Sequence, residues 1–124
     1  MIDIEARVRW VEHLGVRILF VDFSNIANTS DMILVLDAAI HIIENTEGQI
    51  RHLGDYTDCY TSSQFVGALL KAGPRVAHKV AMSAVYGIDG FKYTIGNIFY
   101  NLTPVDGKFF KTREAALAFL TREQ

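Results

Sequence analysis

The period with which hydrophobic and polar residues repeat changes several times along the chain, and each period indicates one kind of element. Residues 6–10 alternate, with Val8 and Trp10 on one face and arginines on the other, as in a strand with one buried face. Residues 16–23 are apolar on both faces, which predicts a central strand that is covered on both sides. Because only a short turn at residues 13–15 joins the two, we expect an antiparallel pair.

The middle of the chain shows helical and strand periods in turn. Residues 30–46 gather polar side chains on one helical face and apolar side chains on another. Residues 50–56 indicate a weaker strand. Ser62 or Ser63 then begins a helix, which we expect the Gly-Pro pair at residues 73–74 to end.

The last third repeats this order. Residues 79–86 form a continuous apolar run with small side chains, which is typical of a buried strand. A helix should follow, whose inward face carries Phe91, Ile95, Ile98, Phe99 and Leu102. We expect a short strand at residues 108–111 and a last helix that begins at Thr112.

The order of these elements, β-β-α-β-α-β-α-β-α, indicates the fold class. Strands that alternate with helices are parallel and joined by right-handed crossovers, while the opening hairpin adds an antiparallel pair. We therefore expect one α/β domain over residues 1–124, with a mixed sheet of about five strands and four main helices. A chain of 124 residues is the size of an ordinary single domain.

Composition and charge narrow the classes of function. The net charge is −2 and the basic residues are scattered, so the chain offers no stripe for nucleic acid. No apolar run approaches the roughly 20 residues that span a bilayer, and acids stand where a signal peptide is basic. The single cysteine forms no internal disulfide. We expect a soluble, cytoplasmic protein.

The stretch DCYTSSQF, residues 58–65, gathers the most reactive side chains just before an apolar helix. Hydroxyl groups at a helix start accept hydrogen bonds from free backbone N–H groups, so a capping role explains Thr61, Ser62 and Ser63. The same exposed hydroxyls could receive a phosphoryl group, whose charge a helix N-terminus stabilises. Both interpretations stay open. We take Asp58 with these three residues as a regulatory or binding surface.

No complete catalytic group can be assembled from the sequence. Cys59 precedes a helix, but a thiol enzyme needs a base, and no spacing places His52 or His78 beside it. The four histidines show no metal-ligand spacing. We therefore expect no enzyme activity, no metal and no cofactor.

Two weaker signals also fail to predict a catalytic or a phosphate-binding site. Asp22 and Asp55 end neighbouring strands and could act as acid and base, but carboxylates there commonly cap turns. Gly87 and Gly90 stand between a strand and a helix, as in phosphate-binding loops, yet the third glycine and the Walker lysine are missing. A tight turn accounts for both glycines.

The helix that follows has a second face of interest. Tyr93, Gly96, Asn97 and Tyr100 fall opposite its apolar face and are predicted to make a flat, amphipathic outer surface. Such a surface suits a partner protein or a second copy of the chain, and a homodimer is the simplest expectation.

The C-terminal half resembles a known family. Residues 75–77 and 79–81 before the strand, Gly87 after it, and the final run FFKTREAALAFL at residues 109–120 are similar to the SpoIIAA-like branch of the STAS superfamily of sulphate transporters and anti-sigma-factor antagonists. In the antagonists, an Asp-Ser-Ser-Gly sequence contains a serine that a partner kinase phosphorylates. The matching residues 61–64 read Thr-Ser-Ser-Gln.

The resemblance implies a SpoIIAA-like fold and leaves two functions open. The preferred function is a non-enzymatic regulatory or protein-interaction module, which is switched at a helix N-terminus. Related domains also bind lipids or other small ligands, so the alternative is a small-molecule or lipid-binding domain. That alternative requires an apolar cavity with a few converging polar groups.

Overall fold

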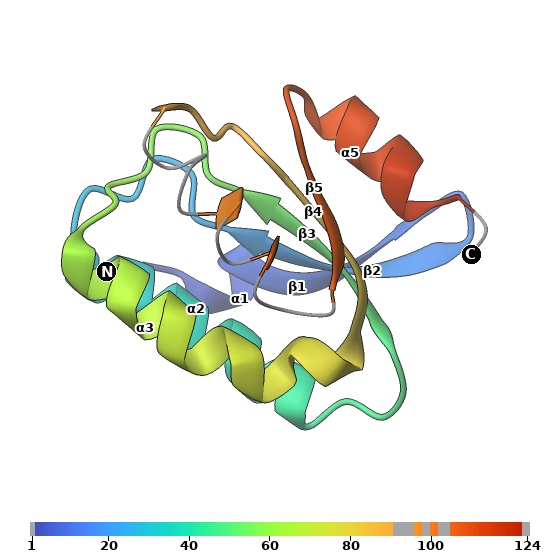
Figure 1. Cartoon of the computed structure of the whole chain (residues 1–124), viewed down its shortest axis with the longest axis horizontal. Helices are drawn as coiled ribbons and strands as arrows, with labels where there is room; N and C mark the ends of the chain where they lie inside the picture. The colour runs from blue at the N-terminus through green and yellow to red at the C-terminus, as the bar shows by residue number, and fades with distance from the viewer. Residues whose placement is uncertain (1, 91–95, 98–99, 102–104, 123–124) are drawn as a thin grey trace.

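Five strands form one mixed sheet in the part of the chain that the structure describes. The computed structural model describes residues 2–90, 96–97, 100–101 and 105–122 (Figure 1). The strands lie side by side in chain order: β1 (Val8–His13), β2 (Val16–Asp22), β3 (Ile50–Asp55), β4 (Val80–Tyr86) and β5 (Asp106–Phe110). β1 is antiparallel to β2, and every later pair is parallel. The predicted α/β fold with a mixed sheet is confirmed.

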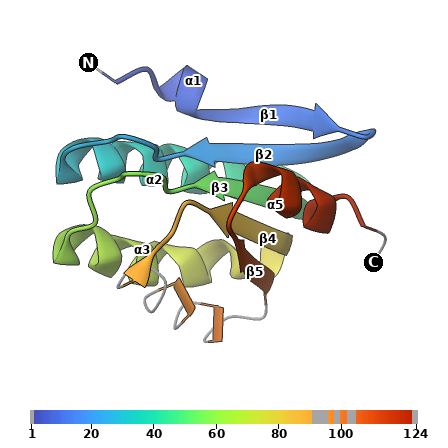
Figure 2. The ribbon, with the colours of Figure 1, turned by 90° about the horizontal axis from the view of Figure 1, so that it is seen from above.

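Helices cover the two faces of the sheet unequally (Figure 2). The long helices α2 (Thr29–Glu44) and α3 (Ser63–Val76) lie on one face. The shorter α5 (Arg113–Leu120) lies on the other. A single helical turn, α1 (Ile4–Arg7), precedes β1, and the 3-10 turn η1 (Ala77–Lys79) joins α3 to β4.

Between β4 and β5, the described residues are consistent with the helix that the sequence predicts. Gly90, residues 96–97 and residues 100–101 are helical. The five positions expected to face inward, Phe91, Ile95, Ile98, Phe99 and Leu102, lie outside the described residues.

The interior strand β2 shows how the core divides into two layers. Leu19 and Val21 pack on the α2 and α3 side, while Ile18 and Phe20 pack on the α5 side. All four side chains are buried. The prediction of a central strand covered on both faces is confirmed, and its cause is the alternation of side chains across the pleat.

Several predicted boundaries were wrong. β5 begins at Asp106, whereas the sequence predicted a strand from residue 108. β1 begins at Val8, because the residues before it form the turn α1, which the Asp3 carboxylate caps by accepting from the Ala6 N–H at 3.3 Å. Helix α3 continues through Gly73 and Pro74 to Val76. Proline disfavours a helix interior, but Pro74 lies in the last turn, and α3 reaches the buried Val76 beyond it.

Candidate functional site

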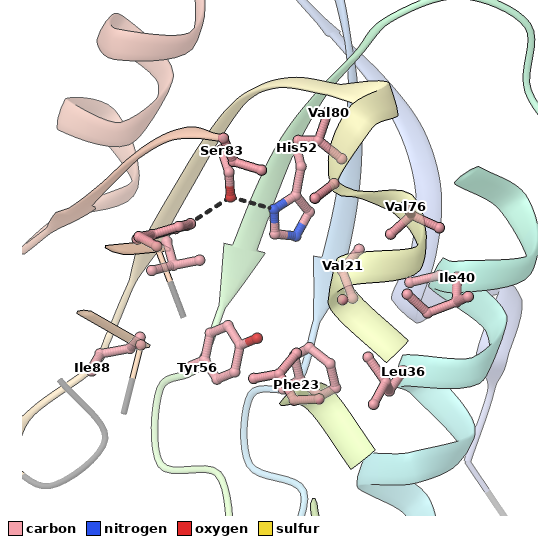
Figure 3. A pocket seen from close by; sticks show the side chains of 18 of the residues that line it. Val21, Phe23, Leu36, Ile40, His52, Tyr56, Val76, Val80, Ser83 and Ile88 are labelled. Atoms are coloured by element: carbon pink, nitrogen blue, oxygen red, sulfur yellow. Dashed lines mark hydrogen bonds between the residues drawn. The ribbon is translucent and has the colours of Figure 1, made fainter. Parts of the chain in front are cut away.

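A cavity lies between the sheet and the two long helices. Its volume is about 120 Å³ (Figure 3). Its apolar wall comprises Val21, Phe23, Leu36, Ala39, Ile40, Ile43, Phe65, Val66, Leu69, Val76, Ala77, Val80, Val85, Ile88, Val105 and Phe109. Gly73 and Gly96 also line it, and its polar groups come from His52, Tyr56, Thr61, Ser83 and Tyr100. The described lining contains no charged side chain.

Three polar side chains form a hydrogen-bonded chain in the wall of this cavity. His52 of β3 and Ser83 of β4 are partners in the parallel register, so both side chains leave the same face of the sheet. His52 Nδ1 lies 2.8 Å from Ser83 Oγ, and Ser83 Oγ lies 2.6 Å from the Tyr100 hydroxyl. Ser83 is the one buried polar side chain among the described residues, and these two bonds satisfy it.

The enclosure of His52 controls its charge. Burial lowers the pKa of His52 from its usual 6.5 to about 4. The imidazole is therefore neutral at pH 7, with one ring nitrogen as a donor and the other as an acceptor. Figure 3 shows the second ring nitrogen turned away from Ser83, towards the space between Val21 and Tyr56.

Tyr56 places a second polar group in the same space. Its ring stacks on Phe23 with centroids 4.8 Å apart, and Phe23 in turn meets the Phe65 ring edge-on at 5.4 Å. Burial raises the pKa of Tyr56, and the neighbouring Tyr100 and Cys59 groups add to that rise. The phenol therefore keeps its proton throughout the neutral range.

Tyr100 and Gly96 correct the predicted outer surface. The Tyr100 ring packs on Phe109 with centroids 5.2 Å apart, and its hydroxyl reaches inward to Ser83. A Cβ added at Gly96 would lie 2.7 Å from the Phe109 ring, so this residue also faces β5. The prediction that both face outward was wrong. Both residues pack against Phe109 of β5, a contact that helical periodicity does not reveal.

The rest of that surface is limited to two residues. Asn97 is exposed, and Tyr93 lies outside the described residues. The homodimer that this surface suggested stays a prediction.

The loop at residues 58–63 borders the cavity at one position. Thr61 lines the cavity, and its hydroxyl lies 3.7 Å from the sulphur of the buried Cys59. Asp58 is exposed and has a left-handed backbone with φ 52°, which aspartate tolerates in turns. One residue of the loop, Thr61, therefore contacts the cavity, while Asp58 faces solvent.

The two serines of this loop have different environments. Ser62 Oγ accepts from the Phe65 N–H at 3.1 Å and from the Thr29 hydroxyl at 2.7 Å. It caps α3 and ties that helix to the first residue of α2, which confirms the capping interpretation for Ser62. Ser63 is exposed at the first residue of α3.

The carboxylates of Asp22 and Asp55 each close a turn at the end of a strand. Asp22 accepts from the Ser24 N–H at 2.8 Å, and Asp55 accepts from the Thr57 N–H at 2.9 Å. Asp55 also accepts from the Tyr86 hydroxyl at 3.1 Å. Both carboxylates are engaged in this way, as expected for residues at strand ends.

Gly87 has a local structural reason as well. It adopts φ 78°, and a Cβ there would collide with the backbone of Thr57. Only glycine allows the loops after β3 and β4 to approach so closely. This contact explains the residue without a bound phosphate.

The Ser83–His52 pair does not make Ser83 a good nucleophile. Its side chain is 4% exposed, and its oxygen is already shared between His52 and Tyr100. An attacking serine needs an open approach and a base held by a third group. Neither Cys59 nor Asp55 lines the cavity with His52. The arrangement is suited to hydrogen bonding a ligand.

Sequence reasoning missed His52, Ser83 and Tyr56 as site residues. A histidine and a serine inside apolar strands are a signal that they face an interior space. Their pairing depends on the register between β3 and β4, which only the assembled sheet defines.

Comparisons with known proteins show the fold. The sequence matches no family model and no curated protein. A solved structure from Shewanella loihica PV-4, an uncharacterized protein of the DUF3478 family with a SpoIIAA-like fold, aligns with a TM-score of 0.67. The two are 20% identical, and the match covers 91% of each chain.

A second solved structure agrees with the first. An anti-sigma-factor antagonist (STAS) domain protein from Planctomyces limnophilus aligns with a TM-score of 0.58 at 11% identity, over 93% of this chain and 99% of that one. This chain therefore has the SpoIIAA-like fold that its C-terminal half suggested. At such identities the likeness extends to the fold and to no particular ligand.

Proposed function

We propose that this domain is a non-enzymatic regulatory module that binds a small, mainly apolar molecule in the cavity between the sheet and helices α2 and α3. The observation that supports it is the cavity itself, whose wall is apolar except for a few polar groups and whose described lining carries no charge. This composition is typical of small-molecule sites. An engineered apolar cavity of about 150 Å³ binds benzene, so a space of about 120 Å³ suits a ligand of similar size.

The loop at residues 58–63 is the proposed output of the module. Thr61 lines the cavity, while Asp58, Tyr60 and Ser63 are exposed next to it. A ligand that contacts Thr61 changes the positions of these exposed side chains. A partner protein that docks on the loop then binds differently to the empty and the ligand-bound domain. Of the two serines only Ser63 is exposed, so a phosphoryl transfer to this loop takes place there.

A titration with benzene, followed by NMR of the methyl and amide groups, tests the proposal. The methyl signals of Val21 and Val76 in the cavity should shift, while those of Leu53 and Leu120 on the α5 face should not. Amide signals of residues 58–63 should shift at the same benzene concentrations.

A cavity-filling variant provides the control. Ala39 is buried on α2 and lines the cavity, so Ala39→Leu places three more carbons inside and should abolish the shifts. Ala118→Leu makes the same change at an exposed position of α5 and should leave them intact. Equal shifts on both faces of the sheet, or none on either, would contradict the proposal.

A further inference from the structure

We propose that the ligand is an uncharged molecule with a carbonyl oxygen, which accepts hydrogen bonds from the Tyr56 hydroxyl and from the Nε2–H group of His52. This inference rests on the proposed function, because it names the chemical class of the molecule that the cavity takes. The two donor groups belong to His52 of β3 and to Tyr56, the residue directly after β3.

Both groups lack a protein partner among the residues that the structure describes. The hydrogen bond of His52 is made by Nδ1 alone, and no described residue bonds the Tyr56 hydroxyl or Nε2. Both side chains are half-buried and line a cavity whose wall is mainly apolar. A donor that is partly removed from water gains free energy from an acceptor, so two such donors facing one cavity favour a bound molecule as their partner.

Gly54 brings the two rings together. His52, Gly54 and Tyr56 are alternate residues, so they share a face of the sheet. A Cβ added at Gly54 would lie 3.3 Å from His52 Cε1 and 3.1 Å from Tyr56 Cε1. One ring carbon of each side chain therefore lies close over this glycine, and we infer that one small ligand group reaches both donors.

The hydrogen-bonded chain behind His52 determines which nitrogen carries the proton. The two hydrogen bonds join Tyr100, Ser83 and His52 Nδ1, and we assign the Tyr100 phenol, which is the stronger acid, as the donor to Ser83 Oγ and Ser83 as the donor to Nδ1. Nδ1 of the neutral ring then accepts, and Nε2 carries the hydrogen. This places an N–H donor beside the O–H donor of Tyr56.

Two donors, and no charged side chain among the described lining residues, favour a carbonyl oxygen. Such an oxygen has two lone pairs and no proton, so it satisfies both donors at once. An alcohol would have to donate its own proton to the Tyr56 oxygen while it accepts from His52, whereas a carbonyl oxygen accepts from both groups. A carboxylate or an ammonium group would be buried in a described lining that holds no counter-charge, which is strongly unfavourable.

The test compares four ring compounds of equal heavy-atom count: cyclohexanone, cyclohexanol, methylcyclohexane and cyclohexylammonium. Each compound has its own cost of leaving water, so the informative quantity is the ratio of its affinities for wild type and for Tyr56→Phe. Calorimetry measures these affinities. Tyr60→Phe, at a neighbouring tyrosine that is 52% exposed, is the matched control.

Tyr56→Phe should weaken cyclohexanone about five- to tenfold, the usual effect of one neutral hydrogen bond, and leave methylcyclohexane unchanged. Tyr60→Phe should change neither, and cyclohexylammonium should not bind. Equal losses for cyclohexanone and methylcyclohexane would overturn the oxygen subsite while leaving the proposed function standing. A larger loss for cyclohexanol than for cyclohexanone would overturn the carbonyl assignment. If the wild type bound none of the four, the proposed function would fail as well.

Discussion

Two glycines show how residues without side chains shape this molecule. Gly54 of β3 lets the rings of His52 and Tyr56 lean together, and an added Cβ would lie only 3.0 Å from Val85 Cγ1. Gly107 of β5 admits the Tyr100 ring, which a Cβ at that position would strike. The two strands flank β4, so both glycines open space for rings on either side of Ser83. A glycine inside a strand signals a close approach of this kind.

At the same scale, His52 should make stability depend on pH. Its pKa is about 4 in the folded protein and 6.5 when it is exposed, so the unfolded chain binds more protons between these values. The contribution of neutral His52 is complete above about pH 6.5 and is lost as the pH falls towards 4, with a total of roughly 3 kcal/mol.

Urea unfolding of wild type and His52→Gln at several pH values measures this effect. Glutamine does not titrate, and its amide can still hydrogen bond Ser83, so every other titrating group cancels in the comparison. The free energy of unfolding of the wild type should fall relative to the variant by roughly 3 kcal/mol from about pH 7 to about pH 4. Parallel curves would show that His52 keeps an ordinary pKa.

Among the elements, the N-termini of α2 and α3 are joined by a side-chain contact. Ser62 caps α3 and receives the Thr29 hydroxyl at 2.7 Å, so one oxygen organises the starts of both helices. Thr61, the residue before it, lines the cavity. Ser62 therefore fixes the backbone next to Thr61, at the edge of the proposed site.

Ser62→Ala should reduce the free energy of unfolding by about 1 kcal/mol, because the Phe65 N–H and the Thr29 hydroxyl lose their acceptor. Ser63→Ala, one residue further on at an exposed position, should change it by less than about 0.5 kcal/mol. Chemical denaturation of both variants measures the difference. Equal effects would mean that Ser62 is not the structural cap.

Most elements could be predicted from the sequence because periodicity and capping are local. The apolar runs of β2 and β4 and the capping residues Ser62 and Thr112 lie where the pattern places them. The end of α3 could not be predicted, because a helix supported by packing continues past Gly73 and Pro74.

At the scale of the whole molecule, the two faces of the sheet are used differently. The α5 face is filled by side chains such as Leu53, Met82 and Leu120, which are fully buried. The face beneath α2 and α3 keeps a cavity whose polar groups come from β3, the loop after β3, β4 and Tyr100 between β4 and β5. Both faces therefore contribute buried core to the fold, and the face beneath α2 and α3 also leaves room for a ligand.

The family resemblance left a ligand-binding domain, which requires an apolar cavity, as one of two functions, but the sequence did not indicate where that cavity would lie. Its polar groups come from residues 31 and 17 positions apart along the chain, which only the strand register and the crossover bring together. The loop at residues 58–63, which we propose as the output, was visible in the sequence because its hydroxyl residues are consecutive. A site made of consecutive residues can therefore be predicted from the sequence. A site whose residues come from several strands cannot.

A crystal structure determined under xenon pressure tests the central claim most directly, because xenon enters apolar space of this size without needing a polar partner. We predict a xenon atom in the cavity beside Val21, Phe65 and Val76, with His52 still bonded to Ser83. A structure without xenon there, with side chains or ordered water filling the space, would contradict the claim that this face of the sheet holds a ligand.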